Sequence, residues 1–266
     1  MKSLDEIAQA NQTMWENEVQ KGGGYTQPWL NLDRAILQQL AADEPIFTAV
    51  PLYELFPTDL LQNVAGKDVL CLAAGGGQQT AVFGLLGARV TVVDLTRGQL
   101  DGDETAAAHY GYPITTVQAD MRDLSALPRQ AFDLVYHADS LAYVPDLRQV
   151  YGEVTQVLRP GGLYRVKHSQ PAVHRTAWNG AAYEIAAPYA ETIQHRADGG
   201  IEFRHRMDDI FNGLIENGFD ILRVVEAPHY QQSFAQAEPG SWGHETRYVA
   251  GGFAIVAQKQ PMKRKT

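Results

Sequence analysis

The chain has 266 residues, of which 45% are hydrophobic, and a formal net charge of −9. This length and apolar content suffice for one sizeable core, and the acidic charge disfavours nucleic acid, because like charges repel a phosphate backbone. Cys71 is the single cysteine, which excludes an intrachain disulfide and a cysteine-based zinc site.

The two ends of the chain show no targeting signal. The first residues lack the apolar segment of a signal peptide, and no apolar run in the sequence has the length of a membrane span. We therefore expect a cytoplasmic protein that does not contact membranes. The basic residues within 261–266 are expected to form a solvated tail, with a functional basic arm as the alternative. The sequence does not decide the oligomeric state.

The N-terminal part of the chain predicts a helical cap over residues 1–64, within the same domain as the rest. Ser3 and Glu6 have the spacing of a capping box, and apolar residues follow on one helical face as far as Val19. Gly22 ends this helix, and a second helix is predicted over residues 31–41.

From residue 67 the pattern alternates between strands and helices, and it continues to about residue 260. Such alternation predicts an α/β, Rossmann-like doubly wound sheet, mostly parallel with helices on both faces. The last strand follows the previous one without a helical pattern between them, which predicts an antiparallel return. Residues 169–207 break the rhythm and predict a lid or insert. Strands are expected at 68–72, 89–93, 114–118, 132–136, 163–167, 221–225 and 248–257, and helices at 79–86, 97–110, 147–158 and 208–217. Residues 241–245 are expected to be a loop.

A cluster of small residues follows the first of these strands. Four apolar residues, 69–72, lead into Ala73, Gly75, Gly76 and Gly77, and a helical pattern starts near Gln79. Small residues let the backbone turn sharply and let a ligand approach its N–H groups, and the helix N-terminus adds positive potential. The alternative is a strand-to-helix turn without a ligand.

Polar residues follow three further strand ends. Asp94 lies about 20 residues beyond the glycine turn, where a carboxylate can accept both hydroxyls of a ribose. Alternatively, it only complements the dipole of the next helix. Asp120 can accept from the exocyclic amine of adenine, with Met121 packed on the ring, or it is an ordinary loop residue. The segment 137–140 is expected beside the same ligand, or as a solvated turn.

Together these residues resemble the class I S-adenosylmethionine (SAM)-dependent methyltransferases over residues 67–168. The strand-four segment 132–146 and the turn 158–163 also match that family. In the family, an acidic residue and a first glycine stand where this chain has Cys71 and Ala73. The N-terminal pattern of Asn11, Trp15 and Val19 also resembles a bacterial subgroup with no assigned substrate. The resemblance implies a SAM site at Ala73, Gly75, Gly77, Gln78, Asp94, Leu95, Gln99, Asp120, Met121 and His137.

The resemblance also implies direct methyl transfer to a small-molecule acceptor. The candidate proton acceptors near the ends of strands four and five are His137, Asp139 and His168. Aromatic residues are expected to wall the substrate pocket or to pack the cap on the core, whereas Trp15 is assigned to packing. These candidates are Tyr25, Trp29, Tyr143, Trp178 and Tyr183. The histidines are too widely spaced to predict a metal site.

The missing acid leaves open how the methionyl ammonium of SAM is held, and the candidates are backbone groups, Gln78, Gln79 and cap residues such as Tyr25. Two other functions stay open. An NAD(P)-dependent oxidoreductase is the first alternative, but its glycine motif requires glycine or alanine at the position of Thr80. A SAM- or nucleoside-binding protein without catalysis is the second alternative, and the replacement at Cys71 keeps it open.

Overall fold

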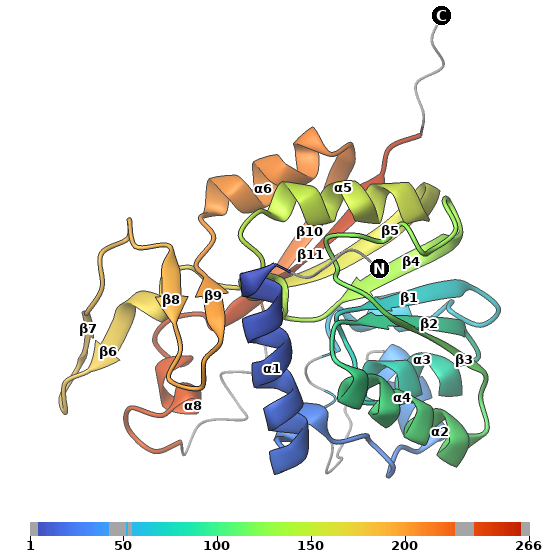
Figure 1. Cartoon of the computed structure of the whole chain (residues 1–266), viewed down its shortest axis with the longest axis horizontal. Helices are drawn as coiled ribbons and strands as arrows, with labels where there is room; N and C mark the ends of the chain where they lie inside the picture. The colour runs from blue at the N-terminus through green and yellow to red at the C-terminus, as the bar shows by residue number, and fades with distance from the viewer. Residues whose placement is uncertain (1–4, 43–51, 53–54, 227–236, 262–266) are drawn as a thin grey trace, which may run out of the picture.

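The centre of the molecule is a seven-stranded sheet with the order β10-β11-β5-β4-β1-β2-β3 (Figure 1). The computed structural model describes residues 5–42, 52, 55–226 and 237–261. Strands β1 to β5 pair in parallel, and β11 is antiparallel to both β5 and β10. The predicted fold class and the antiparallel last strand are therefore confirmed. The strands are β1 (Asp68–Leu72), β2 (Arg89–Asp94), β3 (Ile114–Gln118), β4 (Phe132–His137), β5 (Leu158–Ser169), β10 (Phe219–Glu226) and β11 (Gly252–Lys259).

Helices cover both faces of the sheet, and each face has its own hydrophobic cluster (Figure 1). Side chains alternate along a strand, so Leu70 and Leu72 join one cluster while Val69 and Cys71 join the other. This two-sided burial explains why residues 69–72 of β1 are all apolar. One face carries α5 (Leu147–Val157) and α6 (Met207–Glu216), and the other carries α2 (Arg34–Ala41), α3 (Gln79–Leu85) and α4 (Arg97–Tyr110).

Helix α1 (Glu6–Lys21) stands beside the carboxyl ends of the strands (Figure 1). Polar contacts hold it there. The Gln12 side chain donates to the carbonyl of Leu95 at 2.8 Å, and Glu16 accepts the N–H of Arg97 at 2.9 Å. Asn11 is buried and bridges to the carbonyl of Tyr143, in the short helix η4 (Leu141–Tyr143), and to Ile201. The N-terminal helix is thus fixed to three other segments of the chain.

The segment predicted as a lid or insert forms two small hairpins. They consist of β6 (Thr176–Trp178) with β7 (Tyr183–Ile185), and β8 (Ile193–His195) with β9 (Ile201–Phe203). Both lie beyond the main sheet (Figure 1). The sequence pattern did not predict these strands, because each has only three residues and strand periodicity needs a longer run. The remaining short helices are η1 (Gly24–Thr26), η3 (Thr58–Leu61), η5 (Val173–Arg175) and α8 (Trp242–Glu245).

Several predicted element ends were wrong. Helix α1 starts at Glu6 with Asp5 as its N-cap, and Ser3 lies outside the described residues. Helix α2 starts only at Arg34, because the side chain of Asp33 caps the N–H of Ala35. The predicted loop 241–245 contains α8, and β11 starts at Gly252 rather than at residue 248. Strand β5 extends beyond the predicted 163–167 in both directions.

The predicted cap joins the core of the main sheet. Leu37, Leu40 and Leu61 belong to the same cluster as Val69 of β1. The boundaries at residues 64 and 260 and the basic tail remain predictions, and residues 262–266 lie outside the described part of the chain. Within the described residues, no helix is long and apolar enough to cross a membrane, and no group of His, Cys, Asp and Glu side chains is arranged to hold a metal ion.

Candidate functional site

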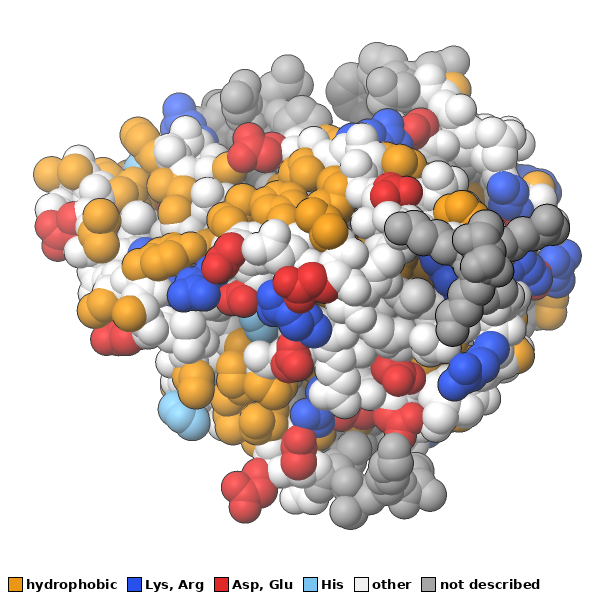
Figure 2. All heavy atoms as spheres, turned by 90° about the horizontal axis from the view of Figure 1, so that it is seen from above, with side chains coloured by type: hydrophobic (Ala, Val, Ile, Leu, Met, Phe, Trp, Pro, Cys, Tyr) orange, Lys and Arg blue, Asp and Glu red, His pale blue; other side chains and the backbone are white. Residues whose placement is uncertain are grey.

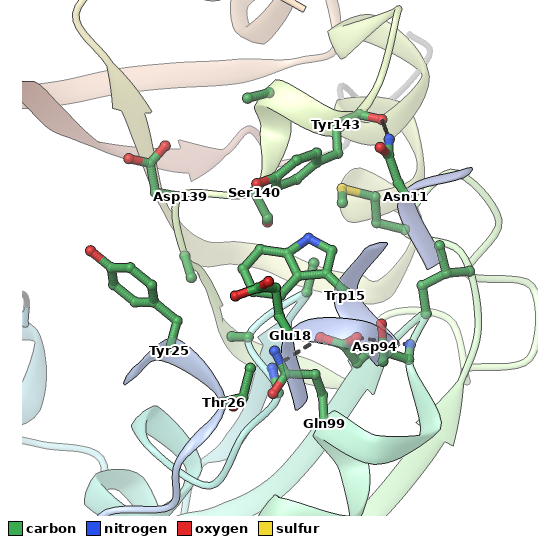
Figure 3. Close-up of a pocket in the computed structure, with 18 of the residues that line it drawn as sticks. Asn11, Trp15, Glu18, Tyr25, Thr26, Asp94, Gln99, Asp139, Ser140 and Tyr143 are labelled. Carbon is green, nitrogen blue, oxygen red and sulfur yellow. Dashed lines mark hydrogen bonds between the residues drawn. The ribbon is translucent and has the colours of Figure 1, made fainter. Parts of the chain in front are cut away.

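A large cavity lies where the carboxyl ends of β1, β2, β3 and β4 meet α1 (Figure 3). Its volume is about 840 Å³. Parallel strands bring residues that are far apart in sequence to one edge of the sheet, and most of the predicted site residues line this single cavity. They are Tyr25, Trp29, Ala73, Gly75, Gln78, Asp94, Leu95, Gln99, Asp120, Met121, Asp139 and Tyr143.

The turn after β1 is held against the end of β2 by Asp94. The N–H of Gly75 donates to Oδ2 of Asp94 at 3.0 Å, and the N–H of Thr96 donates to Oδ1 at 2.9 Å. A Cβ at position 75 would lie 2.9 Å from that Oδ2, so glycine permits the close approach. Burial raises the pKa of Asp94, while these N–H donors favour its ionised form. Asp94 therefore lines the cavity with both of its carboxylate oxygens held by backbone donors.

A second carboxylate, that of Asp103, holds the turn from behind. It accepts from the N–H of Gly76 at 3.3 Å, the N–H of Gly77 at 2.9 Å and the hydroxyl of Thr80 at 2.6 Å. Burial raises the pKa of Asp103 to about 7. The sequence analysis missed this residue, although an acid between Leu100 and Ala106 on the buried side of α4 is a signal of such a role.

The two carboxylates together determine what the turn can bind. The N–H groups of Gly75 and Gly77 donate to Asp94 and Asp103, and that of Gly76 donates to the carbonyl of Gln99 at 3.0 Å and to Asp103. None of the three is left to hold an anion. A pyrophosphate placed here would also meet the carboxylate of Asp94 in the cavity wall. The turn therefore does not suit a dinucleotide, whose pyrophosphate needs free N–H donors at a helix start.

The end of β3 carries an ion pair. Asp120 lines the cavity, and its carboxylate is 2.6 Å from Nη2 of Arg122, which also contacts Asp5 at 2.7 Å. These hydrogen bonds raise the pKa of Arg122. The pair fixes the orientation of Asp120 and joins the start of α1 to the loop after β3. Met121 lies beside it and supplies an apolar surface.

Gln78 connects the turn to the segment that follows α1. Its Nε2 donates to the carbonyls of Gly24 at 2.9 Å and Gln27 at 3.1 Å. Gly77 does not line the cavity. Its carbonyl accepts the N–H of Trp29 at 3.1 Å, and its N–H is bound by Asp103. Gln78 and Gly77 therefore shape the wall through contacts within the protein.

Aromatic side chains from three segments form the opposite wall (Figure 3). Trp15, which the sequence analysis assigned to packing, lines the cavity, and its ring meets Tyr143 edge to face at 5.7 Å. Tyr25 is 74% exposed and stands at the rim. Trp15 was missed because an apolar helical face usually packs on a core, whereas this face of α1, with Ala8 and Met14, lines the cavity.

Trp178 and Tyr183 do not line the cavity, contrary to their predicted place in the substrate pocket. They pack instead on His244 of α8 at the turn end of the first hairpin, where the Tyr183 hydroxyl lies 2.8 Å from Nδ1 of His244. This contact could not be predicted from the residues around Trp178 and Tyr183, because His244 lies some 60 residues further along the chain.

His137 and His168, two of the three candidate proton acceptors, lie behind the cavity wall. Nδ1 of His137 is 2.7 Å from the Tyr164 hydroxyl, and Nε2 of His168 is 3.0 Å from the Tyr151 hydroxyl. Both tyrosines lie in the hydrophobic core, where a hydroxyl needs a partner. Burial lowers the pKa of His137 to about 3 and that of His168 well below its usual value. The geometry therefore gives neither histidine support as a base.

His137 reaches the cavity only through Ser140. Its Nε2 is 2.9 Å from the Ser140 hydroxyl, which lines the cavity (Figure 3). Asp139, the third candidate, lines the cavity directly and lies 3.4 Å from the Ser169 hydroxyl and 3.7 Å from Nζ of Lys167. The segment after β4 therefore presents a carboxylate and an oriented hydroxyl next to each other.

One buried acceptor in the cavity wall has no partner within the described residues. Oε1 of Gln99 is inaccessible and unbonded, although the Gln99 side chain lines the cavity next to Gly76. This oxygen packs against Gly76 and faces the protein interior, so it is not a ligand contact. The Asp94 carboxylate in the cavity wall can accept from ribose hydroxyls, and the turn has no free N–H for a phosphate. SAM carries an adenosyl group and no phosphate, so it fits the residues present.

The sequence comparisons agree with this geometry. A family model described as a methyltransferase domain matches residues 70–166. The chain is 27% identical over 237 residues to an uncharacterized methyltransferase, YbaJ, of Bacillus subtilis, and the match covers 84% of this chain and 91% of that protein.

Solved structures show the same relationship. A SAM-dependent methyltransferase from Mesorhizobium loti is similar with a TM-score of 0.64 and 26% identity, over 76% of this chain and 94% of that one. The geranyl diphosphate C-methyltransferase of Streptomyces coelicolor, solved with S-adenosyl-L-homocysteine, has a TM-score of 0.59 and 17% identity, over 96% of this chain and 98% of that one. The second likeness concerns the fold alone.

Proposed function

We propose that this chain, which is a class I SAM-dependent methyltransferase, transfers the methyl group to a small organic molecule bound in the cavity beneath α1. SAM is its cofactor. What we propose is the class of the acceptor and the roles of the individual residues.

The observation that carries the proposal is the order of side chains along the sheet edge. Met121 lies beyond β3, Asp94 at the end of β2, the glycine turn beyond β1, and Asp139 and Ser140 beyond β4. In this order Met121 would hold the adenine and Asp94 the ribose hydroxyls. The turn would face the amino-acid tail, which leaves the region beyond β4 and β5 for the acceptor.

SAM supplies an already activated methyl group, so the protein has to align the reactants and exclude water. Trp15 and Tyr143 close the cavity from the side of α1. The Ser140 hydroxyl is held in one orientation by His137 and can donate to or accept from a polar acceptor group. Asp139 lies beside it and is our candidate for a proton acceptor where the acceptor must lose a proton.

The position of the cavity supports a small acceptor. The cavity wall includes α1 and, from the insert and the loop before it, Glu202, Arg196 and His174, so a polymer would have to pass between these segments. The net charge of −9 disfavours nucleic acid. On the face seen in Figure 2, basic and acidic side chains are intermixed over α5 and α6, as in the ion pairs of Arg148 with Asp209 and Glu216. We further propose that the protein acts in the cytoplasm, as the buried single cysteine supports.

Two alternatives make different predictions. A nicotinamide-dependent oxidoreductase is disfavoured because the N–H groups of the turn, which a pyrophosphate would need, already donate to Asp94 and Asp103. A SAM-binding protein without catalysis would bind the cofactor but release no methylated product.

Incubation of the protein with methyl-labelled SAM and a bacterial extract separates these possibilities. After fractionation by size, we expect the label in the small-molecule fraction, and less of it with the Asp139→Asn variant. Label in protein or nucleic acid would contradict the proposed acceptor class. Binding of SAM with no transfer in any fraction would favour the non-catalytic alternative.

A further inference from the structure

We propose that Glu18 of α1 binds the ammonium group of the cofactor's amino-acid tail and so supplies the carboxylate that β1 lacks. This inference rests on the proposed arrangement of SAM in the cavity and assigns one further residue to it. Its starting point is Cys71, which occupies the position of the family's acid. Cys71 is fully buried in the cluster beneath the sheet and does not line the cavity.

The nearby carboxylates of the sheet and α4 are already engaged. Asp94 accepts from Gly75 and Thr96 and faces the ribose position, while Asp103 lies behind the turn and outside the cavity wall. The N–H groups of the turn are donors and cannot bind an ammonium. Gln78, which the sequence suggested for this role, is anchored to Gly24 and Gln27 by its amide nitrogen, and its amide oxygen is uncharged, so it cannot supply the missing negative charge.

Glu18 reaches the same end of the cavity from α1. Its side chain lines the cavity and lies with Trp15, Tyr25 and Thr26 in the close-up (Figure 3). The backbone links it to the turn. A Cβ on Gly23 would lie 3.1 Å from Oε2 of Glu18, and a Cβ on Gly76 would lie 3.0 Å from the carbonyl of Tyr25. Glu18, residues 23–26 and Gly76 are therefore contiguous.

The carboxylate of Glu18 is available to a ligand. Its partner is Lys21, 2.8 Å from Oε1 and itself 63% exposed. A solvent-exposed pair of this kind contributes little and is readily exchanged for a second cation. An ammonium bound by Glu18 would replace this weak surface pair with a charged contact inside the cavity.

The test compares two ligands that differ only in the tail. S-adenosylhomocysteine carries the ammonium, whereas 5′-methylthioadenosine has the same nucleoside and thioether without the amino acid. Calorimetry should show that Glu18→Gln weakens binding of S-adenosylhomocysteine by about 10- to 100-fold and leaves binding of 5′-methylthioadenosine unchanged. The control Glu6→Gln removes one charge from the same helix outside the cavity and should change neither ligand.

Further variants separate this role from a structural one. Glu18→Asp should retain part of the affinity, and Lys21→Ala should not weaken binding of S-adenosylhomocysteine. Equal losses for both ligands, or no loss for either, would overturn the assignment of Glu18 while leaving the cofactor site intact. If the unmodified protein binds neither ligand, the proposed site itself is wrong.

Discussion

Asn11 links α1 to the rest of the cavity, and its substitution should loosen that helix. The side chain is 3% exposed. Its Nδ2 donates to the carbonyls of Tyr143 at 3.2 Å and Ile201 at 3.0 Å, and its Oδ1 accepts the N–H of Ile201 at 2.7 Å. At about 1 kcal/mol for each hydrogen bond, Asn11→Ala should cost roughly 3 kcal/mol of α1 docking.

This loss should appear in both stability and binding. Because α1 contributes Trp15 and Glu18 to the cavity, affinity for S-adenosylhomocysteine should fall, at most about a hundredfold. Amide hydrogen exchange followed by mass spectrometry should show faster exchange across α1, with β1 and β4 unchanged. Gln12→Ala is the matched control, because it removes one hydrogen bond, to Leu95, from the same helix.

The reasoning would be refuted if Asn11→Ala left exchange in α1 unchanged, or if Gln12→Ala had the same effect. The first result would mean that α1 docks through its apolar face alone. The second would mean that the three hydrogen bonds of Asn11 contribute no more to the docking of α1 than the single hydrogen bond of Gln12.

Three further predictions concern the turn and the acceptor end of the cavity. Burial raises the pKa of Asp103 to about 7, so the native state keeps a proton that the unfolded chain has released above about pH 4. This contribution to stability falls as the pH rises from about 4 to 7, and urea unfolding of Asp103→Asn should lack that slope, worth up to about 4 kcal/mol. Gly77→Ala should destabilise by at least about 2 kcal/mol, because its Cβ would lie 2.4 Å from the carbonyl of Gly102 at a φ of 74°, whereas Gly24→Ala has open space and should be neutral in thermal unfolding. Asp139→Asn should lower kcat by about a hundredfold or more for an acceptor that loses a proton and leave cofactor affinity unchanged, and equal turnover would exclude it as the base.

The sheet could be predicted because its signals are local. Residues 69–72 of β1 are all apolar since both faces of the strand are buried there. Gly111 ends α4 in the left-handed conformation that a glycine adopts readily. The predicted cofactor residues lie together because the carboxyl ends of parallel strands meet at one edge, which follows from the alternation of strands and helices.

The rest depends on contacts between distant segments. In the sequence, Asp103 is one of several acidic residues of α4. Only the packed structure shows that it binds the turn after β1. Whether Trp15 faces the core or the cavity depends on where α1 docks, which Asn11 and Gln12 decide through partners 83 to 190 residues away. The histidines were candidate bases because they follow the ends of strands, but His137 is a hydrogen-bond partner of the Tyr164 hydroxyl in the core.

The central claim is that one cavity binds SAM through Asp94 and presents its methyl group beside Asp139 and Ser140. A crystal structure of the complex with S-adenosylhomocysteine tests it most directly. We predict that both ribose hydroxyls contact the carboxylate of Asp94, that the adenine lies on Met121, and that the sulfur faces the segment after β4. A nucleoside bound elsewhere, or bound here with its ribose away from Asp94, would contradict the account.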